Sequence, residues 1–326
     1  MNATAGHEPL DVLLLSMEWT PKVSGGVGTH VFELGTGLAA RGHRTTVLAY
    51  TPSEPQHITG ANLSAHLFPP SQHSFASAAQ TSLVAGILAF NRDLIARADA
   101  IVAERRPAII HFHQWHTQPA ARELGARHGI PVVGSSHHLS DPTERWWGQE
   151  PDPEILDQER QLFDGTVDII TVSDSMVDLI CATFDLPRSK VHRVHCAMDV
   201  ERFRGRDPSA AALARLRTKV ALDGDQIVLY VGRIHPQKGM PALYQAAEQV
   251  IAARPQVRYL LAGGTDSRES TAMIRDLERA YPGIKRHMKL LGKLPREQLP
   301  LLHRIADVVL VPSVYEPFGY TAIEAM

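Results

Sequence analysis

Two acidic side chains, Glu316 and Glu324, are separated by seven residues at a predicted strand-to-helix junction. The run VVLVPS before them is apolar and β-branched, as in a buried strand, and TAIEAM after Pro317 and Gly319 has the character of a helix start. In open α/β sheets ligands bind at this edge, where a helix N-terminus suits a phosphate. A carboxylate one turn into the helix would repel phosphate, so its expected partners are hydroxyl groups. The pair predicts a nucleotide sugar as ligand. The alternative is a capped core helix with two solvated acids.

A pair of cations, Arg233 and Lys238, lies in the loop between the predicted strand IVLYVG and the helix that follows it. A diphosphate that leaves a sugar gains negative charge as the bond breaks, and two fixed cations can stabilise this charge without a metal ion. The loop therefore predicts a diphosphate site in the second half of the chain. The alternative is a solvated loop.

Glycines in the first half of the chain predict a close approach between backbone and ligand. A buried strand is predicted over residues 11–17, and Gly25, Gly26 and Gly28 precede a helix predicted over residues 29–41. With the strand TTVLAY that follows, these segments form a βαβ unit whose glycine loop leaves room for a ligand. The alternative is a tight turn.

Histidines gather around two further predicted strands. His111 and His113 alternate along AIIHFH, so they share a face, and His116 follows in the loop. His137 comes directly after the strand IPVVGSS, at the ligand-binding edge. No carboxylate or cysteine nearby in the sequence completes a three-histidine metal site, so polar lining of a cleft is preferred and no metal is predicted. The alternative for His137 is a histidine satisfied by local backbone.

Trp146 and Trp147 stand in an acidic segment, residues 141–159, which contains a single base, Arg145. Aromatic rings beside acids suit stacking on a sugar or holding an acceptor, so this pair is a candidate acceptor site. The alternative is a solvated loop with one buried tryptophan.

The composition is that of a soluble globular protein, with 44 % hydrophobic and 21 % charged residues and room for two domains in 326 residues. A formal net charge of −2 argues against nucleic acid as a partner, and no apolar run reaches the roughly 20 residues of a transmembrane span. Cys181 and Cys196 imply no disulfide framework, and Cys196 is not predicted to be a nucleophile. The start lacks a basic leader, so a cytoplasmic location is predicted. Residues 53–73, rich in Pro, Ser and His, are predicted to be irregular.

The segment YEPFGYTAIEAM, residues 315–326, resembles the two-glutamate signature of the retaining glycosyltransferases of family 4, which have the GT-B fold. GGVGTHVFELGTGLAARGH resembles the first loop and helix of that family, KVHRVHCAMDVERF its crossing between domains, and Gly-Arg…Lys-Gly its diphosphate-binding pair. The usual asparagine–glycine pair of the crossing is replaced by Cys196–Ala197. The resemblance extends over essentially the whole chain, which stops at Met326 inside the signature helix.

This resemblance implies an α/β fold of two Rossmann-like domains facing across a cleft. It implies an acceptor-side domain over residues 1–203 and an incomplete nucleotide-sugar-binding domain over residues 204–326. The catalytic residues that it implies are His137 and Glu316 at the donor sugar and Arg233 and Lys238 at the diphosphate, and Glu324 is implied to contact the ribose. The full implied donor-binding set is Gly25, Gly26, Gly28, Arg233, Lys238, Gly263, Gly292, Leu294, Glu316, Phe318, Gly319, Tyr320, Thr321 and Glu324.

The implied reaction moves a sugar from a nucleotide-diphosphate sugar to an unidentified hydroxyl acceptor, with retained configuration and with neither a metal nor a separate cofactor. Retention without an evident enzymic nucleophile fits front-face attack, in which the leaving phosphate takes the proton of the acceptor. Three alternatives remain open: an α-glucan synthase, a nucleotide-sugar epimerase, and a non-catalytic fragment or binding module.

Overall fold

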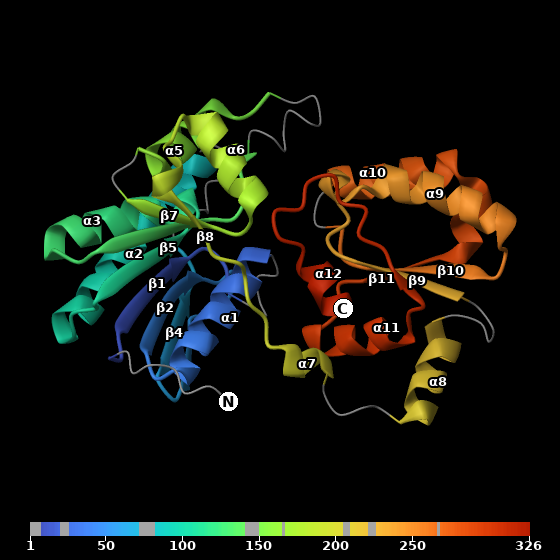
Figure 1. The fold of residues 1–326 in the computed structure, drawn as a ribbon, viewed down its shortest axis with the longest axis horizontal. Coiled ribbons are helices and arrows are strands. Elements are labelled where there is room, and N and C mark those ends of the chain that lie inside the picture. Colours follow the sequence, from blue (N-terminus) through green and yellow to red (C-terminus); the bar gives the residue numbers. More distant parts are fainter. Residues whose placement is uncertain are drawn as a thin grey trace. The chain divides into compact units, whose positions relative to one another are not determined.

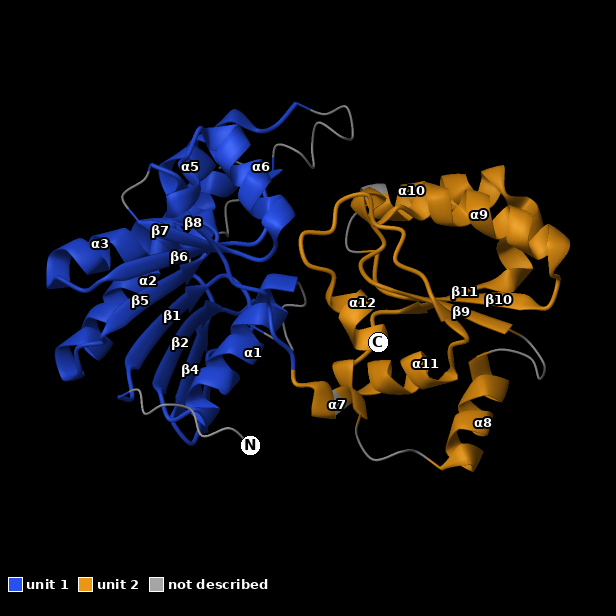
Figure 2. Cartoon of the chain, viewed as in Figure 1, with its two compact units in different colours: residues 1–198 blue, residues 199–326 orange. Residues whose placement is uncertain are grey.

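The chain divides into two compact units, residues 1–198 (unit 1) and residues 199–326 (unit 2), as Figure 2 shows. The computed structural model describes residues 8–19, 26–71, 82–140, 150–164, 167–204, 209–220, 226–265 and 268–326. The division after Met198 falls within the segment that the sequence indicates as the crossing between domains. The assignment of acceptor and donor roles to the two parts stays a prediction.

Unit 1 is built on an eight-stranded sheet in the order β3-β4-β2-β1-β5-β6-β7-β8 (Figure 1). Every neighbouring pair is parallel except β3 and β4. The strands are β1 (Asp11–Ser16), β2 (Arg44–Tyr50), β3 (Gln56–Gly60), β4 (Leu63–Phe68), β5 (Ile109–His113), β6 (Val132–Ser136), β7 (Asp168–Thr171) and β8 (Val191–Arg193). The helices are α1 (Gly26–Ala40), α2 (Leu83–Glu104), α3 (Gln118–His128), α5 (Pro153–Leu162) and α6 (Asp174–Phe184), with short 3-10 turns η1 (Trp115–Thr117) and η2 (Arg188–Lys190).

The central strands of unit 1 are apolar because the sheet is covered by helices. Leu13, Leu14 and Leu15, three successive residues of β1, are fully buried. Since successive side chains of a strand point to opposite faces, both faces of β1 are covered, as is usual in a parallel sheet. On one face, Val31 of α1 packs in a cluster with Leu14 and Val47. The predicted βαβ start of the chain is confirmed.

Two predictions for unit 1 are wrong in detail. Helix α1 begins at Gly26 rather than near residue 29, so Gly26 and Gly28 belong to its first turn and not to the loop. The segment predicted as irregular over residues 53–73 contains the antiparallel pair β3 and β4. Ala65 and Leu67 are buried at alternate positions, a strand periodicity that the surrounding Ser and His residues obscure in the sequence.

Unit 2 is built on a parallel sheet of four strands in the order β11-β10-β9-β12. The strands are β9 (Gln226–Val231), β10 (Val257–Ala262), β11 (Met288–Gly292) and β12 (Val308–Val309). The helices are α7 (Val200–Arg204), α8 (Ala210–Val220), α9 (Met240–Ala253), α10 (Arg268–Ala280), α11 (Leu299–Ile305) and α12 (Tyr320–Ala325), with 3-10 turns η3 (Pro236–Lys238), η4 (Pro282–His287) and η5 (Arg296–Gln298).

Helices cover both faces of the sheet in unit 2, with α9 and α10 on one side and α11 on the other (Figure 1). Alternate residues of β10 show this arrangement. Tyr259 and Leu261 join the cluster that contains residues of α9 and α10, whereas Leu260 and Ala262 join the cluster that contains residues of α11. Each unit is therefore a Rossmann-like α/β domain with its own core.

The last strand is shorter than VVLVPS predicts. Strand β12 comprises only Val308 and Val309, and one further backbone bond, from Leu310 N–H to the carbonyl of Leu229 at 2.8 Å, extends the pairing. Pro312 has no N–H group, so the ladder cannot continue through it.

Candidate functional site

The loops that follow β9 and β12 are tied together at the carboxyl ends of their strands. Val314 N–H donates to the carbonyl of Gln237 at 2.9 Å, and Gln237 Nε2 donates to the carbonyl of Tyr315 at 3.1 Å. Gly239 has a φ of +69°, and a Cβ there would lie 1.9 Å from the carbonyl oxygen of Pro312. Only glycine fits this contact, so the two loops have a fixed register.

This register joins two of the predicted site residues. Lys238 Nζ donates to Glu316 Oε2 at 2.7 Å, across 78 residues of sequence, and the two side chains are 20 % and 28 % exposed. Ser313 Oγ donates to the same carboxylate oxygen at 2.7 Å. An ammonium has three N–H donors, so this ion pair uses one of the donors of Lys238. The cation and the carboxylate are thus held together at one point of the sheet edge.

Arg233 shares the electrostatic environment of that ion pair. Burial raises the pKa of Tyr230, the negative charge of Glu316 raises it further, and the positive charge of Arg233 opposes them. The Tyr230 hydroxyl donates to the carbonyl of Arg233 at 2.6 Å, while the Arg233 side chain is exposed. Burial, then the charges of Arg233 and Lys238, lower the pKa of His235. At neutral pH this loop therefore carries two cations and a neutral imidazole.

The segment around α12 is anchored to β9. Thr321 Oγ1 donates to the carbonyl of Val231, the last residue of β9, at 3.1 Å. Gly319 precedes the helix with a φ of +89°, in the left-handed region that glycine favours. The rings of Phe318 and Tyr320 meet edge to face, with centroids 5.1 Å apart. The helix itself has six residues, and the phosphate contact predicted at its N-terminus stays a prediction.

Glu324 is largely buried against two basic side chains. Its side chain is 7 % exposed, with one carboxylate oxygen 3.6 Å from Arg296 Nη2 and the other 3.9 Å from His303 Nε2. Burial lowers the pKa of His303, so Arg296 is the cationic partner at neutral pH. The predicted contact of Glu324 with ribose hydroxyls stays a prediction.

Three other predicted donor residues have structural reasons for their types. A Cβ at Gly263 would lie 1.7 Å from the carbonyl oxygen of Gly232, so close packing of the ends of β9 and β10 requires a glycine there. Gly292 has a φ of +70° at the end of β11. Leu294 packs against the hydrophobic cluster of unit 2 that contains Leu229. Their donor contacts stay predictions.

One of the predicted glycines of unit 1, Gly28, hydrogen-bonds to a carboxylate. Gly28 N–H, in the first turn of α1, donates to Glu18 Oε2 at 3.0 Å, which satisfies an N–H group that the helix start would otherwise leave unpaired. A Cβ at Gly26 would meet no atom within 4 Å. Gly25, Trp146 and Trp147 lie outside the described residues, so their predicted roles stay predictions.

Four histidines of unit 1 form one buried cluster. His111 and His113 of β5 share a face as predicted, with ring centroids 4.4 Å apart. His137, in the loop directly after β6, lies with its Nε2 3.1 Å from His113 Nδ1. His30 of α1 joins them, with its ring centroid 4.6 Å from that of His137. His111 Nε2 is 2.8 Å from Ser135 Oγ. We call these four residues the histidine cluster.

Burial keeps the imidazoles of the histidine cluster neutral. It lowers the pKa of His30 to about 4. Burial, followed by the charge of His30, lowers the pKa of His111 to about 3. The pKa values of His113 and His137 also lie well below the ordinary range, first because of burial and then because of neighbouring imidazoles. At neutral pH these rings can donate or accept hydrogen bonds and bind metals, but they are not cations.

Sequence reasoning missed several residues of these sites. His30 lies on the buried face of α1 beside Val31, and helical periodicity could have found it. His235 stands between Arg233 and Lys238 in the sequence, and its position between two predicted site residues could have identified it as part of the site. Ser313 precedes Glu316 by only three residues, so its spacing was a local signal, whereas only the fold brings Arg296 to Glu324.

The arrangement in unit 2 is the kind of site that binds an anionic, hydroxyl-rich ligand. Cations and a carboxylate stand together at the carboxyl ends of parallel strands, where ligands bind in Rossmann-like domains. No helix in the described part of the chain is both long and apolar enough to cross a membrane. The fold is that of the GT-B glycosyltransferases, with a large parallel sheet and two Rossmann-like domains.

Comparison with known proteins defines the family. Residues 24–202 match Glycosyltransferase Family 4, and residues 214–326 match Glycosyl transferases group 1. The chain belongs to glycosyltransferase family 4 and is a hexosyltransferase-type enzyme.

Three relatives illustrate the likeness. A glycogen synthase of Mycobacterium tuberculosis is 29 % identical over 330 residues, which cover 96 % of this chain and 75 % of the relative. The structure of sucrose-phosphate synthase from Thermosynechococcus elongatus has a TM-score of 0.78 at 23 % identity, covering 97 % of this chain and 78 % of that one. Alr3699/HepE of Anabaena, solved in complex with UDP and glucose, has a TM-score of 0.72 at 16 % identity, covering 97 % and 78 %.

Proposed function

We propose that unit 2 binds the diphosphate of a nucleotide-sugar donor through Arg233 and Lys238, and that the enzyme transfers the sugar to a hydroxyl acceptor with retention of configuration. The observation that carries the proposal is the ion pair of Lys238 and Glu316, 2.7 Å long, at the carboxyl edge of the sheet. A cation suits the diphosphate and a carboxylate suits the sugar hydroxyls. UDP and glucose in the Alr3699/HepE complex support this class of donor.

Lys238 keeps the capacity to bind phosphate while it is paired with Glu316. One N–H of its ammonium reaches Glu316 Oε2, and the other two can donate to phosphate oxygens. Arg233 adds a planar guanidinium donor with an exposed side chain in the same loop. Because His235 is held neutral, it adds no charge of its own. The loop is thus preorganised for a dianionic leaving group.

Glu316 is oriented for a second role. Lys238 and Ser313 both donate to Oε2, so these two bonds fix the carboxylate plane and involve neither lone pair of Oε1. We assign Oε1 to hydroxyl groups of the donor sugar near the anomeric carbon. The positions of Glu324 at the ribose and His137 at the sugar belong to the same proposal.

The reaction balances without a metal ion or an enzymic nucleophile. The bond between the anomeric carbon and the diphosphate oxygen breaks, and the acceptor oxygen forms a bond to the same face of that carbon. The departing phosphate oxygen takes the acceptor proton. Arg233 and Lys238 stabilise the charge that develops on the diphosphate, so the proposed transfer needs no metal ion.

Replacement of Lys238 tests the proposal. We expect Lys238→Ala to cost about 2–4 kcal/mol of transition-state stabilisation, a loss of roughly 30- to 1000-fold in kcat/KM. The assay measures donor hydrolysis and transfer with a panel of nucleotide sugars, while titration calorimetry with nucleoside diphosphates reports binding. NMR of the product gives its anomeric configuration, which should match that of the donor. Activity should be unchanged when a metal chelator is added, as expected for metal-independent transfer.

Lys285→Ala is the matched control. Lys285 pairs with Glu278 at 3.0 Å in the same unit, but it lies in η4, before the amino end of β11. We expect this variant to keep its activity within about twofold, as for a surface ion pair. A loss below twofold for Lys238→Ala would remove the assigned role of that residue.

The identity to a glycogen synthase favours one second candidate, an α-glucan synthase. Phe318 after Pro317 and the sequence around Glu324 are less typical of that group. Incorporation of labelled sugar into a glycogen-like primer decides between them, because small hydroxyl acceptors would not be extended by a primer-dependent synthase.

A further inference from the structure

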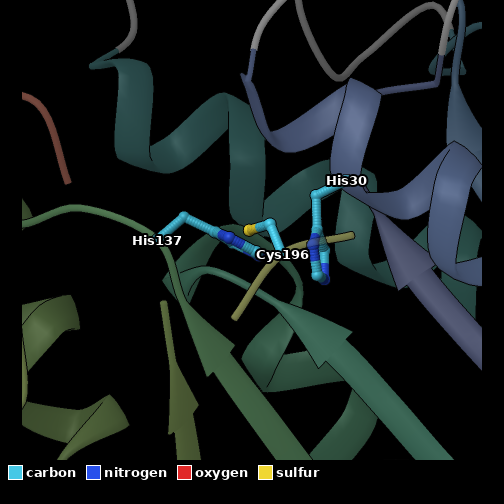
Figure 3. Close-up of side chains that lie close together, drawn as sticks. All are labelled: His30, His137 and Cys196. Atoms are coloured by element: carbon cyan, nitrogen blue, oxygen red, sulfur yellow. The ribbon is translucent and has the colours of Figure 1, made fainter. Parts of the chain in front are cut away.

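Two members of the histidine cluster and one cysteine of unit 1 lie close together. His30 comes from α1, His137 from the loop after β6, and Cys196 from the segment after β8 (Figure 3). One ligand atom of each lies within 4.8 Å of the other two. Among the described residues, this is the group of histidine, cysteine and carboxylate side chains whose spacing suits a metal ion. It differs from the three-histidine set considered from the sequence.

His30 offers a buried nitrogen that the protein does not otherwise use. The residue is 8 % exposed, and its Nδ1 is buried with no hydrogen-bond partner in the described structure. Leaving such an atom unsatisfied costs about 1–3 kcal/mol. A bound cation would satisfy it, because a neutral imidazole presents a lone pair at one ring nitrogen. This unsatisfied atom is an observation independent of the spacing of the three residues.

We propose that His30, His137 and Cys196 bind a divalent transition-metal ion of the zinc class. Two imidazoles and one thiolate form a ligand set that suits Zn²⁺, and a fourth position would remain for water or another ligand. Cys196 binds as the thiolate, so its S–H proton is released to solvent on binding.

The spacing requires only a small closure. With bonds of about 2.0–2.3 Å, a tetrahedral ion holds neighbouring donor atoms about 3.3–3.8 Å apart. Because all three donor atoms lie within 4.8 Å of one another, no pair has to draw in by more than about 1.5 Å. His137 and His30 are ring neighbours already, and the Cys196 side chain has a single flexible torsion.

His113 gives the site an outer partner. Its Nδ1 lies 3.1 Å from His137 Nε2, and a metal bound through His137 Nδ1 would leave this bond in place. In that tautomer His137 Nε2–H donates to His113, which orients the ring as outer partners of metal-bound histidines commonly do. A metal-bound His137 would then have no ring nitrogen left for the donor sugar, so metal binding and the sugar contact proposed for His137 exclude each other.

The two cysteines of the chain provide an internal comparison. Both Cys181, in α6, and Cys196 are partly exposed, and neither is in a disulfide. We expect one equivalent of Zn²⁺ to slow alkylation of Cys196 by iodoacetamide at least about tenfold, because a metal-bound thiolate is less available. Cys181 should react at an unchanged rate. Peptide mass spectrometry measures both rates in one sample, and equal effects at the two cysteines, or none at Cys196, overturn the proposal.

Variants and Co²⁺ substitution sharpen the test. Cys181→Ser should bind one Zn²⁺ per chain like the unaltered protein, whereas Cys196→Ser and His30→Gln should lose at least about tenfold in affinity, measured by competition with a chelating dye. Co²⁺ should give a thiolate charge-transfer absorption that is absent in Cys196→Ser. Circular dichroism checks that each variant folds, and the alkylation experiment stands alone should His30→Gln fail to fold. Zinc binding that persists unweakened in Cys196→Ser overturns the proposal.

Discussion

The histidine cluster of unit 1 and the Lys238–Glu316 pair of unit 2 differ in the burial and the charge of their side chains. The histidine cluster is buried, and its imidazoles remain neutral because burial lowers their pKa values. Lys238 and Glu316 are partly exposed and form an ion pair 2.7 Å long. Burial without counterions favours neutral side chains, while partial exposure beside a counterion favours charged side chains. The first arrangement suits a metal ion or a neutral sugar, and the second suits a diphosphate.

The charge of Glu316 is the feature of this comparison whose loss should matter most. We expect Glu316→Gln to lower kcat/KM roughly 30- to 150-fold, about 2–3 kcal/mol, since the amide keeps the shape but not the charge that orients Lys238. Glu278→Gln, which alters the matched pair with Lys285, should change kcat/KM less than about twofold. Steady-state kinetics with one donor measures both. Similar losses in the two variants would mean that the charge at Glu316 has no special role.

The contact between Gly239 and Pro312, which holds the loop of Lys238, can be disrupted by a substitution that changes no charged residue. Gly239→Ala introduces a Cβ against the Pro312 carbonyl at a φ of +69°, and we expect a local destabilisation of about 2–3 kcal/mol. Hydrogen exchange should increase in peptides from the loops after β9 and β12. Gly283→Ala is the control, because a Cβ there meets no atom within 4 Å. Unchanged exchange in Gly239→Ala would contradict the fixed register of these loops.

The pH dependence of the free energy of unfolding should show that the buried imidazoles of unit 1 are neutral in the folded state. An unfolded histidine takes up a proton below about pH 6.5, but His111 does so only near its folded pKa of about 3. Between these values the unfolded state binds more protons, so stability falls as pH falls. At pH 5 the loss is about 2 kcal/mol for this one residue.

His111→Gln tests that dependence, because the amide can still hydrogen-bond to Ser135 and does not titrate. We expect the difference in free energy of unfolding between pH 7 and pH 5 to be about 2 kcal/mol smaller in this variant. Urea unfolding followed by tryptophan fluorescence reports unit 1, because all four tryptophans lie within residues 1–198. An identical pH dependence in variant and unaltered protein would refute the assignment.

Removal of the Ser313 hydroxyl, which orients Glu316, should have the smallest effect on kcat/KM. Ser313→Ala removes one hydrogen bond to Glu316 Oε2, and we expect a cost of about 1 kcal/mol, roughly fivefold in kcat/KM. Ser209→Ala removes a hydroxyl that accepts from Ala212 N–H at the start of α8, and its kcat/KM should not change. If the two serine variants behave alike, the second bond to Glu316 does not contribute.

The sequence by itself determined the parts of this protein that depend on local pattern. Apolar runs with glycine and proline at their ends predicted the strands of two Rossmann-like domains, and the position of His137 directly after β6 followed from them. Lys238 and Arg233 were predicted as diphosphate-binding residues from their place after a strand, because parallel strands put all their carboxyl ends at one edge, and this role stays a prediction. The pattern failed for β4, where polar residues break up an otherwise regular alternation.

Only the tertiary structure decided which of these residues touch. The 2.7 Å bond between Lys238 and Glu316 depends on a backbone contact at Gly239 that no sequence pattern announces. His30, His137 and Cys196 come from three separate segments, and no spacing along the chain brings their donor atoms within 4.8 Å. Local propensity acts over a few residues, whereas contacts between distant loops depend on how whole strands and helices pack, and this packing alone decides which side chains meet.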